Sequence, residues 1–249
     1  MAGEPLRSAL VTGASSGIGA ACVRALTASG VETWALARRM DRLEALAAET
    51  GCIPLSADLM DAESTEAALS NVAPDILINN AGLGAGITGL ATASPGDVAR
   101  TIGTNVEALL QVTRVLLPGM IERGRGHIVN MGSVAGSYPI NSAVYGGSKG
   151  AVRMISQNLR LELRGTGIRV SEIAPGRVTT EFFEVAVPDP GPNVPTTLPI
   201  TSLTPEDIAD AVMFAVNAPP HVNVSLVEVQ PTEQHFGGVH FDPLEWADG

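Results

Sequence analysis

The chain has 249 residues, of which 45% are apolar and 16% are charged, and this composition is typical of one sizeable globular α/β domain. Its formal net charge of −11 argues against a nucleic-acid partner and against binding to an anionic membrane. Cys22 and Cys52 are too few for a disulfide framework or a metal-ligand cluster, so we expect no metal site. The uncharged runs at 76–96 and 126–148 are broken by Gly, Asn, Ser or Pro, so we expect no membrane span. Together these features predict a cytoplasmic protein.

A glycine-rich motif lies near the start of the chain. The apolar run at 8–12 predicts a buried strand, which leads into Thr-Gly-Ala-Ser-Ser-Gly-Ile-Gly at 12–19 and then into a helix-period pattern. Glycines permit the tight turn and let a phosphate approach the backbone, while the helix N-terminus supplies free N–H groups. A purely structural turn is the alternative, but strand, turn and helix in this order favour a dinucleotide site.

The second predicted strand, at 32–37, ends next to two arginines. An acidic residue at this point binds the ribose 2′-hydroxyl of NAD, whereas Arg suits the 2′-phosphate of NADP. Arg38 and Arg39 follow Ala37, and no acid is present there. Both arginines could be solvated charges, but the pair and the missing acid together predict NADP(H).

The following segments continue the alternation of helix and strand. We expect helices at 42–50 and 61–71 and strands at 52–57 and 75–79. Asp58, at the end of the first of these strands, either accepts a hydrogen bond from the adenine amino group or caps the next helix. Asn79 and Asn80 end a buried strand, so we expect a hydrogen-bond network across the strand ends to satisfy their amides.

The second half of the chain is predicted in the same way. We expect helices at 95–123, 143–164 and 205–217, the last capped by Thr204, and strands at 127–131, 169–173 and 222–229. Asn105 lies inside the first of these helices, where a core-facing amide needs a structural or catalytic reason. The pattern dissolves at 177–203, a stretch with five prolines that we interpret as a substrate lid, and 231–249 is a polar tail with interleaved aromatic residues.

Alternating strands and helices predict a single α/β domain over residues 1–249, a doubly wound (Rossmann) parallel sheet of seven strands with helices on both faces. Right-handed crossovers give the strand order 3-2-1-4-5-6-7. Gly13, Asp58, Asn80, Ser133 and Pro175 then all lie at the carboxyl ends of strands, which is where such sheets bind ligands.

Ser133, Tyr145 and Lys149 form the candidate reaction site. Tyr145 and Lys149 are four residues apart, so a helix that starts at 143 projects both side chains from one face. A phenol with a pKa of about 10 is a poor acid or base at neutral pH, and an ammonium beside it lowers that pKa. The hydroxyl of Ser133 could bind a substrate oxygen at the same point. Lys149 is the only lysine among 15 basic residues. The alternative to a reaction site is a Tyr145 that only packs in the core beside a lysine on the surface. The spacing alone does not distinguish the two, so the other motifs of the chain have to.

Together these motifs resemble the short-chain dehydrogenase/reductase family. The likeness covers 8–231 and rests on the glycine-rich motif at 12–19, Asn-Asn-Ala-Gly at 79–82, Asn105, Ser133, Tyr145-x-x-x-Lys149 and Pro-Gly at 175–176. It implies that Tyr145 is the acid/base and that Ser133 orients the carbonyl. It also implies that Lys149 lowers the pKa of Tyr145 and binds the nicotinamide ribose, and that Asn105 holds a water of the proton relay.

The resemblance further implies which residues contact NADP(H). They lie in the glycine-rich turn and at the strand ends: Gly13, Ser15, Ser16, Gly17, Ile18, Gly19, Arg38, Arg39, Asp58, Leu59, Asn80, Ala81, Gly82, Tyr145, Lys149, Pro175, Gly176, Val178 and Thr180. The reaction it implies is hydride transfer between this cofactor and a secondary alcohol or carbonyl of a small molecule.

Shorter segments resemble NADP-dependent 3-hydroxy acid dehydrogenases, a group that acts on serine, allo-threonine and 3-hydroxypropionate-like compounds. They lie at 117–123, 127–130, 135–139, 203–208 and 220–224. A reductase of a larger ketone or of an acyl-thioester ketone is the alternative within the family, and a non-catalytic NADPH-binding sensor is the alternative outside it. The loop at 134–144 is one residue shorter than is usual in the family. The pocket wall near 139–142 can therefore differ from that of the family, and the sequence does not determine the substrate.

Four residues are candidates for substrate contacts: Ser133, Asn141, Tyr145 and Arg177. Arg177 either pairs with a substrate carboxylate, or points to solvent, or pairs with Glu181 or Glu184. The apolar side chains of Phe182 and Phe183 favour a less polar ketone.

The helices at 95–123 and 143–164 carry more apolar positions than one sheet contact needs. An exposed apolar helix face is usually an interface, so we expect a homo-oligomer. The family likeness points to a tetramer built on these two helices.

Overall fold

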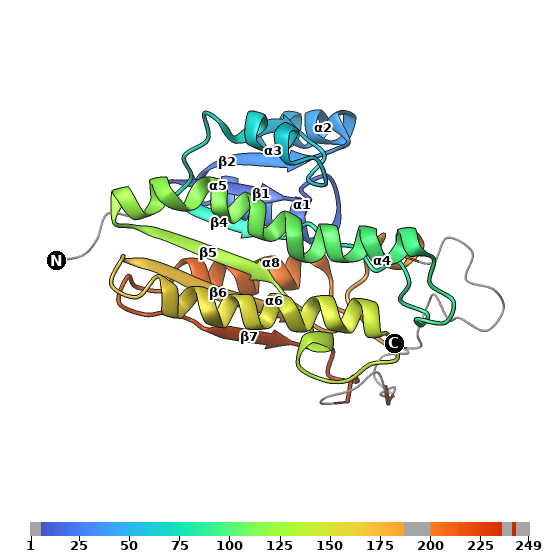
Figure 1. The fold of residues 1–249 in the computed structure, drawn as a ribbon. Coiled ribbons are helices and arrows are strands. Elements are labelled where there is room, and N and C mark those ends of the chain that lie inside the picture. The colour runs from blue at the N-terminus through green and yellow to red at the C-terminus, as the bar shows by residue number, and fades with distance from the viewer. Residues whose placement is uncertain (1–5, 187–199, 236–240, 243–249) are drawn as a thin grey trace.

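The computed structural model describes residues 6–186, 200–235 and 241–242. Its centre is a parallel sheet in the order β3-β2-β1-β4-β5-β6-β7, which confirms the predicted topology. The strands are β1 (Ser8–Thr12), β2 (Glu32–Ala37), β3 (Ile53–Ser56), β4 (Ile76–Asn79), β5 (Gly126–Met131), β6 (Ile168–Pro175) and β7 (Leu226–Val229). The strand arrowheads that are visible in Figure 1 point to the same end of the molecule.

The helices are α1 (Gly17–Ala28), α2 (Met40–Thr50), α3 (Ala62–Leu69), α4 (Pro95–Ile102), α5 (Ala108–Arg123), α6 (Ala143–Glu162), α7 (Phe182–Ala186) and α8 (Pro205–Val216). Thr204 caps α8 as predicted, because its hydroxyl accepts a hydrogen bond from the Asp207 N–H at 3.2 Å. None of the described helices is long and apolar enough to cross a bilayer.

Helices cover both faces of the sheet, as Figure 1 shows, with α5 and α6 in front and α8 behind. Successive residues of β1 point to opposite faces. Val11 therefore packs in a core with residues of α1, α2 and α8, whereas Leu10 packs in a second core with residues of α3, α5 and α6. Each fully buried leucine or isoleucine of these cores contributes about 1.5–3 kcal/mol.

Three predicted elements differ from the structure. The helix predicted at 95–123 is interrupted by a π-helical turn, Gly103–Glu107, which is centred on Asn105. The strand predicted at 222–229 begins only at Leu226, because upstream the side-chain amide of Asn223 replaces the main chain, accepting from the Val170 N–H at 2.9 Å and donating to the Val170 carbonyl at 3.2 Å. The predicted lid at 177–203 contains the short helix α7.

Parts of the predicted lid and tail, at 187–199, 236–240 and 243–249, lie outside the described residues. The described part of the tail folds back to the strand ends. Gln234 accepts a hydrogen bond from the Arg177 N–H at 2.9 Å, just beyond β6.

Candidate active site

The glycine-rich turn joins β1 to α1 closely. Gly13 and Gly17 have φ angles of +66° and +53°, which only glycine adopts without strain. A Cβ atom at Gly19 would lie 2.4 Å from the Gly13 carbonyl oxygen, so this position also excludes a side chain. The Ser16 side chain caps none of the first amides of α1, and no acidic residue lies in the first turn of that helix. The positive end of α1 is therefore presented for an anion.

Arg39 lies against this turn. Its guanidinium donates to the Ser15 hydroxyl at 3.0 and 3.2 Å and to the Ser16 hydroxyl at 2.9 Å. Arg38 and Arg39 are both exposed at the rim of the same cavity. The turn and the arginines together match the donor set that a 2′-phosphate requires.

The carboxylate of Glu181 binds Arg39 at this turn, a contact that the sequence analysis did not predict. It accepts from Arg42 at 2.7 and 2.9 Å and from Arg39 at 3.3 Å. The hydrogen bond from Arg42 is the main cause that holds the pKa of Glu181 below its usual range. The sequence alone allows Glu181 as one possible partner of Arg177. Arg42 and Arg39 lie 139 and 142 residues before Glu181 in the chain, so no local sequence pattern indicates this contact.

Asp58 and the paired asparagines have structural partners. The Asp58 carboxylate accepts from the Met60 N–H at 3.1 Å, while the cap of α3 is Asp61. The Asn80 side chain donates to the carbonyl of Thr12 at 2.9 Å. Asn79 donates to the side chains of Thr113 at 3.0 Å and Asn130 at 2.9 Å. The predicted network across the strand ends thus forms, but it leaves the buried side-chain oxygen of Asn79 without a hydrogen-bond partner among the described residues.

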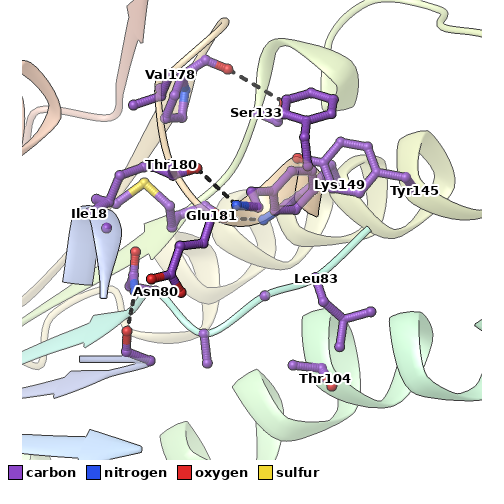
Figure 2. A pocket seen from close by; sticks show the side chains of 18 of the residues that line it. Ile18, Asn80, Leu83, Thr104, Ser133, Tyr145, Lys149, Val178, Thr180 and Glu181 are labelled. Carbon is purple, nitrogen blue, oxygen red and sulfur yellow. Dashed lines mark hydrogen bonds between the residues drawn. The ribbon is translucent and has the colours of Figure 1, made fainter. Parts of the chain in front are cut away.

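Ser133, Tyr145 and Lys149 come together beyond β5 and at the start of α6 (Figure 2). The Ser133 hydroxyl donates to the Pro175 carbonyl at 3.4 Å and accepts from the Ala135 N–H at 3.1 Å. Lys149 is buried, and its ammonium donates to the Met131 carbonyl at 2.8 Å and lies 6.0 Å from the centre of the Tyr145 ring. The three side chains line one cavity, so the predicted cluster forms.

The pKa of Tyr145 differs in direction from the expectation. Burial raises it, and a hydrogen bond with Ser133 offsets only part of that effect. Burial also lowers the pKa of Lys149 from 10.5 to about 8, and the charge of Glu172 opposes this shift. Desolvation therefore sets the direction of the Tyr145 shift, and the Lys149 ammonium bonds to a main-chain carbonyl instead of to the phenol.

Asn105 lies behind the cavity on the π-helical turn. Its side chain accepts from the Leu83 N–H at 2.8 Å and donates to the Leu83 carbonyl at 2.9 Å. It also donates to the Ser148 hydroxyl at 2.9 Å, and Ser148 lies between Tyr145 and Lys149 in α6. The extra residue of a π turn lets this buried amide face both segments, and such turns are frequent at functional sites.

Aromatic side chains of α7 connect Tyr145 with Arg177. The ring centres of Tyr145 and Phe182 are 5.4 Å apart, and those of Phe182 and Phe183 are 5.3 Å apart. The Arg177 guanidinium lies 3.5 Å from the centre of the Phe183 ring, a cation–π contact, and burial lowers its pKa. Glu181, one of the carboxylates expected to pair with Arg177, binds Arg39 and Arg42.

One cavity of about 640 Å³ unites these groups. All predicted cofactor and substrate residues line it except Gly19, which is buried at the start of α1. Asn105 does not line it, but it bonds to both main-chain groups of Leu83, which does, and to Ser148 between Tyr145 and Lys149. The volume suits a cofactor-sized ligand. The cavity also includes side chains that the sequence did not single out for the site: Met60, Leu83, Ile87, Thr104, Glu181, Gln234 and Phe241.

Comparison with known proteins gives consistent results. Residues 7–190 match the model of the short chain dehydrogenase family. An NADP-dependent 3-hydroxy acid dehydrogenase from Salmonella typhi is 41% identical over 240 residues, covering 92% of this chain and 97% of that protein.

Two solved structures extend the comparison. A closed form of serine dehydrogenase complexed with NADP+ is 38% identical, with a TM-score of 0.88 over 95% of this chain and 100% of the other. Serine dehydrogenase from Escherichia coli is 37% identical, with a TM-score of 0.80 over 92% of this chain and 100% of the other.

Proposed function

The chain belongs to the short-chain dehydrogenase family, and from this premise we propose that it interconverts a secondary alcohol and a carbonyl, with NADP(H), at Ser133, Tyr145 and Lys149. The observation that carries the proposal is a single cavity that joins these three side chains to a phosphate-binding turn flanked by arginines. The protein is an NADP-dependent oxidoreductase acting on CH–OH groups, in keeping with its relatives.

The residues present fit NADP(H). In this proposal the α1 N-terminus and the turn at 12–19 hold the pyrophosphate, and Arg39 with Ser15 holds the 2′-phosphate. Val178 and Thr180, which line the cavity beside Pro175 and Gly176, hold the nicotinamide end. When bound, the nicotinamide supplies the hydride acceptor or donor.

The protein's own groups handle the proton and the orientation. Tyr145 is a neutral phenol at working pH, because burial raises its pKa, so it donates its proton to the substrate oxygen in the direction of reduction. Ser133, which lines the same cavity as Tyr145, orients the same oxygen. Lys149 favours the phenolate that is left behind. Asn105 positions Ser148 and, as the family likeness implies, a water of the proton relay.

We propose a small 3-hydroxy acid as the substrate class, which is what the name of the Salmonella typhi relative states. Arg177 supports it, because a half-buried guanidinium at the cavity wall can pair with a carboxylate while its other face stacks on Phe183. The specific observation for a larger, less polar ketone is the aromatic wall of Phe182 and Phe183.

Kinetics with Arg177→Met separate the two substrates. The variant keeps most of the side chain's bulk and removes the charge, so KM for 3-hydroxypropionate and serine should rise about tenfold or more, since a charge-assisted contact contributes about 1.5–3 kcal/mol. Neutral alcohols measured with the same variant serve as the control and should be unaffected. A wild type that ignores these acids and reduces bulky neutral ketones contradicts the 3-hydroxy acid assignment.

We also propose a homotetramer that works in the cytoplasm. Leu110 and Ile121 on α5, and Met154 and Leu161 on α6, expose apolar side chains that a second subunit can cover. Cys22 and Cys52 are free thiols, which suits a reducing compartment.

A further inference from the structure

A carboxylate of this chain occupies the cluster that we assign to the 2′-phosphate. Glu181 accepts from Arg42 at 2.7 and 2.9 Å and from Arg39 at 3.3 Å. The same Arg39 guanidinium donates to the hydroxyls of Ser15 and Ser16. These four bonds use all but one of the five N–H donors of Arg39, so a phosphate that binds this guanidinium through two donors has to take over at least one bond that it already makes.

The segment that carries Glu181 lies directly on the glycine-rich turn. A Cβ atom at Gly17 would lie 3.2 Å from the Thr180 methyl group. Glu181 also lines the cofactor cavity, and Figure 2 shows its side chain on the same segment as Val178 and Thr180. The carboxylate is therefore within the cofactor cavity itself and not on a remote surface.

Charge and exposure make this carboxylate displaceable. Arg42 and Arg39 hold the pKa of Glu181 below its usual range, so it stays ionised at every pH at which the enzyme would work. The side chains of Glu181, Arg39 and Arg42 are about two-fifths exposed, at 41%, 42% and 41%. Ion pairs with this exposure are weak. A phosphate carries more charge and more acceptor oxygens than a carboxylate, so it is the stronger partner for Arg39.

We propose that Glu181 is a specificity-determining residue that competes with the 2′-phosphate of NADP(H) for Arg39. The inference rests on the proposed use of NADP(H). Binding of the phosphorylated cofactor then includes the loss of a Glu181 ion pair, which lowers its affinity. Binding of NAD(H), which has no 2′-phosphate, leaves the pair intact. Glu181 thus reduces the preference for NADP(H) below what the arginines alone would give.

The competition also reaches the substrate wall. Glu181 directly precedes Phe182, the first residue of α7, whose ring lies 5.4 Å from that of Tyr145. A carboxylate that leaves Arg39 releases one tether of this segment.

Glu181→Gln tests the competition because it keeps the size of the side chain and removes its charge. The dissociation constants of NADPH and NADH are measured by nucleotide fluorescence or calorimetry, without substrate. We expect NADPH to bind about threefold to tenfold more tightly to the variant in low salt, with NADH unchanged. The gain should shrink in high salt because the ion pair is screened. Adenosine 2′,5′-bisphosphate and adenosine 5′-phosphate, which lack the nicotinamide, should reproduce the difference.

Two comparisons make the result specific. Glu184→Gln removes an exposed charge on α7 and should leave both cofactors unchanged. In an Arg39→Ala background, Glu181→Gln should no longer tighten NADPH binding, so that the ratio of the dissociation constants without and with the substitution is about one. A double-mutant cycle requires this result when the two residues interact.

Failure of the inference is separable from failure of the proposed function. If the wild type prefers NADH, the assignment of NADP(H) fails. If it prefers NADPH but Glu181→Gln binds NADPH more weakly, equally well, or with the same gain as NADH, then Glu181 does not compete with the phosphate and the inference is overturned.

Discussion

Replacing Lys149 with Met should stabilise the fold while it abolishes activity. Lys149 is buried on α6, and its ammonium has one direct protein acceptor among the described residues, the Met131 carbonyl at 2.8 Å. Burial lowers its pKa from 10.5 to about 8. The folded protein therefore holds this positive charge less readily than the unfolded chain does, and methionine fills the same volume without a charge.

The magnitude follows from the size of that drop. At about 1.4 kcal/mol for each pKa unit, the buried charge costs about 3 kcal/mol wherever both states are protonated, which is below pH ~8. Leaving the Met131 carbonyl without its donor removes about 1 kcal/mol of that gain. The variant should thus be about 2 kcal/mol more stable at pH 7, a rise in Tm of about 4–8 °C for a chain of this length.

The stability difference between Lys149→Met and the wild type should depend on pH. Between pH ~8 and ~10.5 the unfolded wild type binds a proton that the folded wild type has released, so wild-type stability attributable to Lys149 rises with pH in that window. The advantage of Lys149→Met should therefore shrink from pH 8 upward and vanish by about pH 10.5. Arg164→Met removes an exposed charge just beyond α6 and should show no such trend. Urea unfolding at pH 7 and pH 10 measures both variants; a Lys149→Met protein that is less stable than wild type at pH 7 refutes the reasoning.

The remaining predictions concern the reaction, the cofactor and the assembly. Tyr145→Phe removes the proposed proton donor and should lower kcat by about 10²–10⁴-fold with little change in the dissociation constant of NADPH; near wild-type turnover would exclude Tyr145 as the acid. Arg39→Ala should weaken NADPH by about tenfold to a hundredfold and NADH little, and by more than Arg38→Ala does, because Arg39 is the arginine bonded to the turn; equal losses for both cofactors would contradict this assignment. Light scattering at micromolar concentration should give the mass of a tetramer, and a monomer would contradict the proposed interface on α5 and α6.

The sheet and the main cluster were predictable because they depend on local patterns and one topological rule. Apolar runs mark the strands, and right-handed crossovers fix their order. Since parallel strands end at one edge, Gly13, Asn80 and Ser133 had to meet there. The spacing of Tyr145 and Lys149 then placed both on one face of α6.

The rest depends on contacts between distant segments. The π-helical turn at Gly103–Glu107 exists where Asn105 bonds both main-chain groups of Leu83, a loop residue that no periodicity announces. The pairing of Glu181 with Arg42 joins the segment after β6 to α2, which follows β2. The upward shift of the Tyr145 pKa likewise follows from burial of the phenol, which the sequence does not report.

We expect the short loop between Ser133 and Tyr145 to change the substrate wall while it leaves the reacting groups in place. Its first part is anchored at Gly136, where a Cβ atom would lie 2.6 Å from the Lys149 carbonyl oxygen. Its last part is anchored at Ser142, whose hydroxyl accepts from the Tyr145 N–H at 3.3 Å and so sets the start of α6. Only 137–141 lie between these anchors, and Ile140 and Asn141 of this stretch line the cavity. We expect the residue that this loop lacks to be missing from that stretch, so that the chain keeps the family's reaction while its choice of substrate differs.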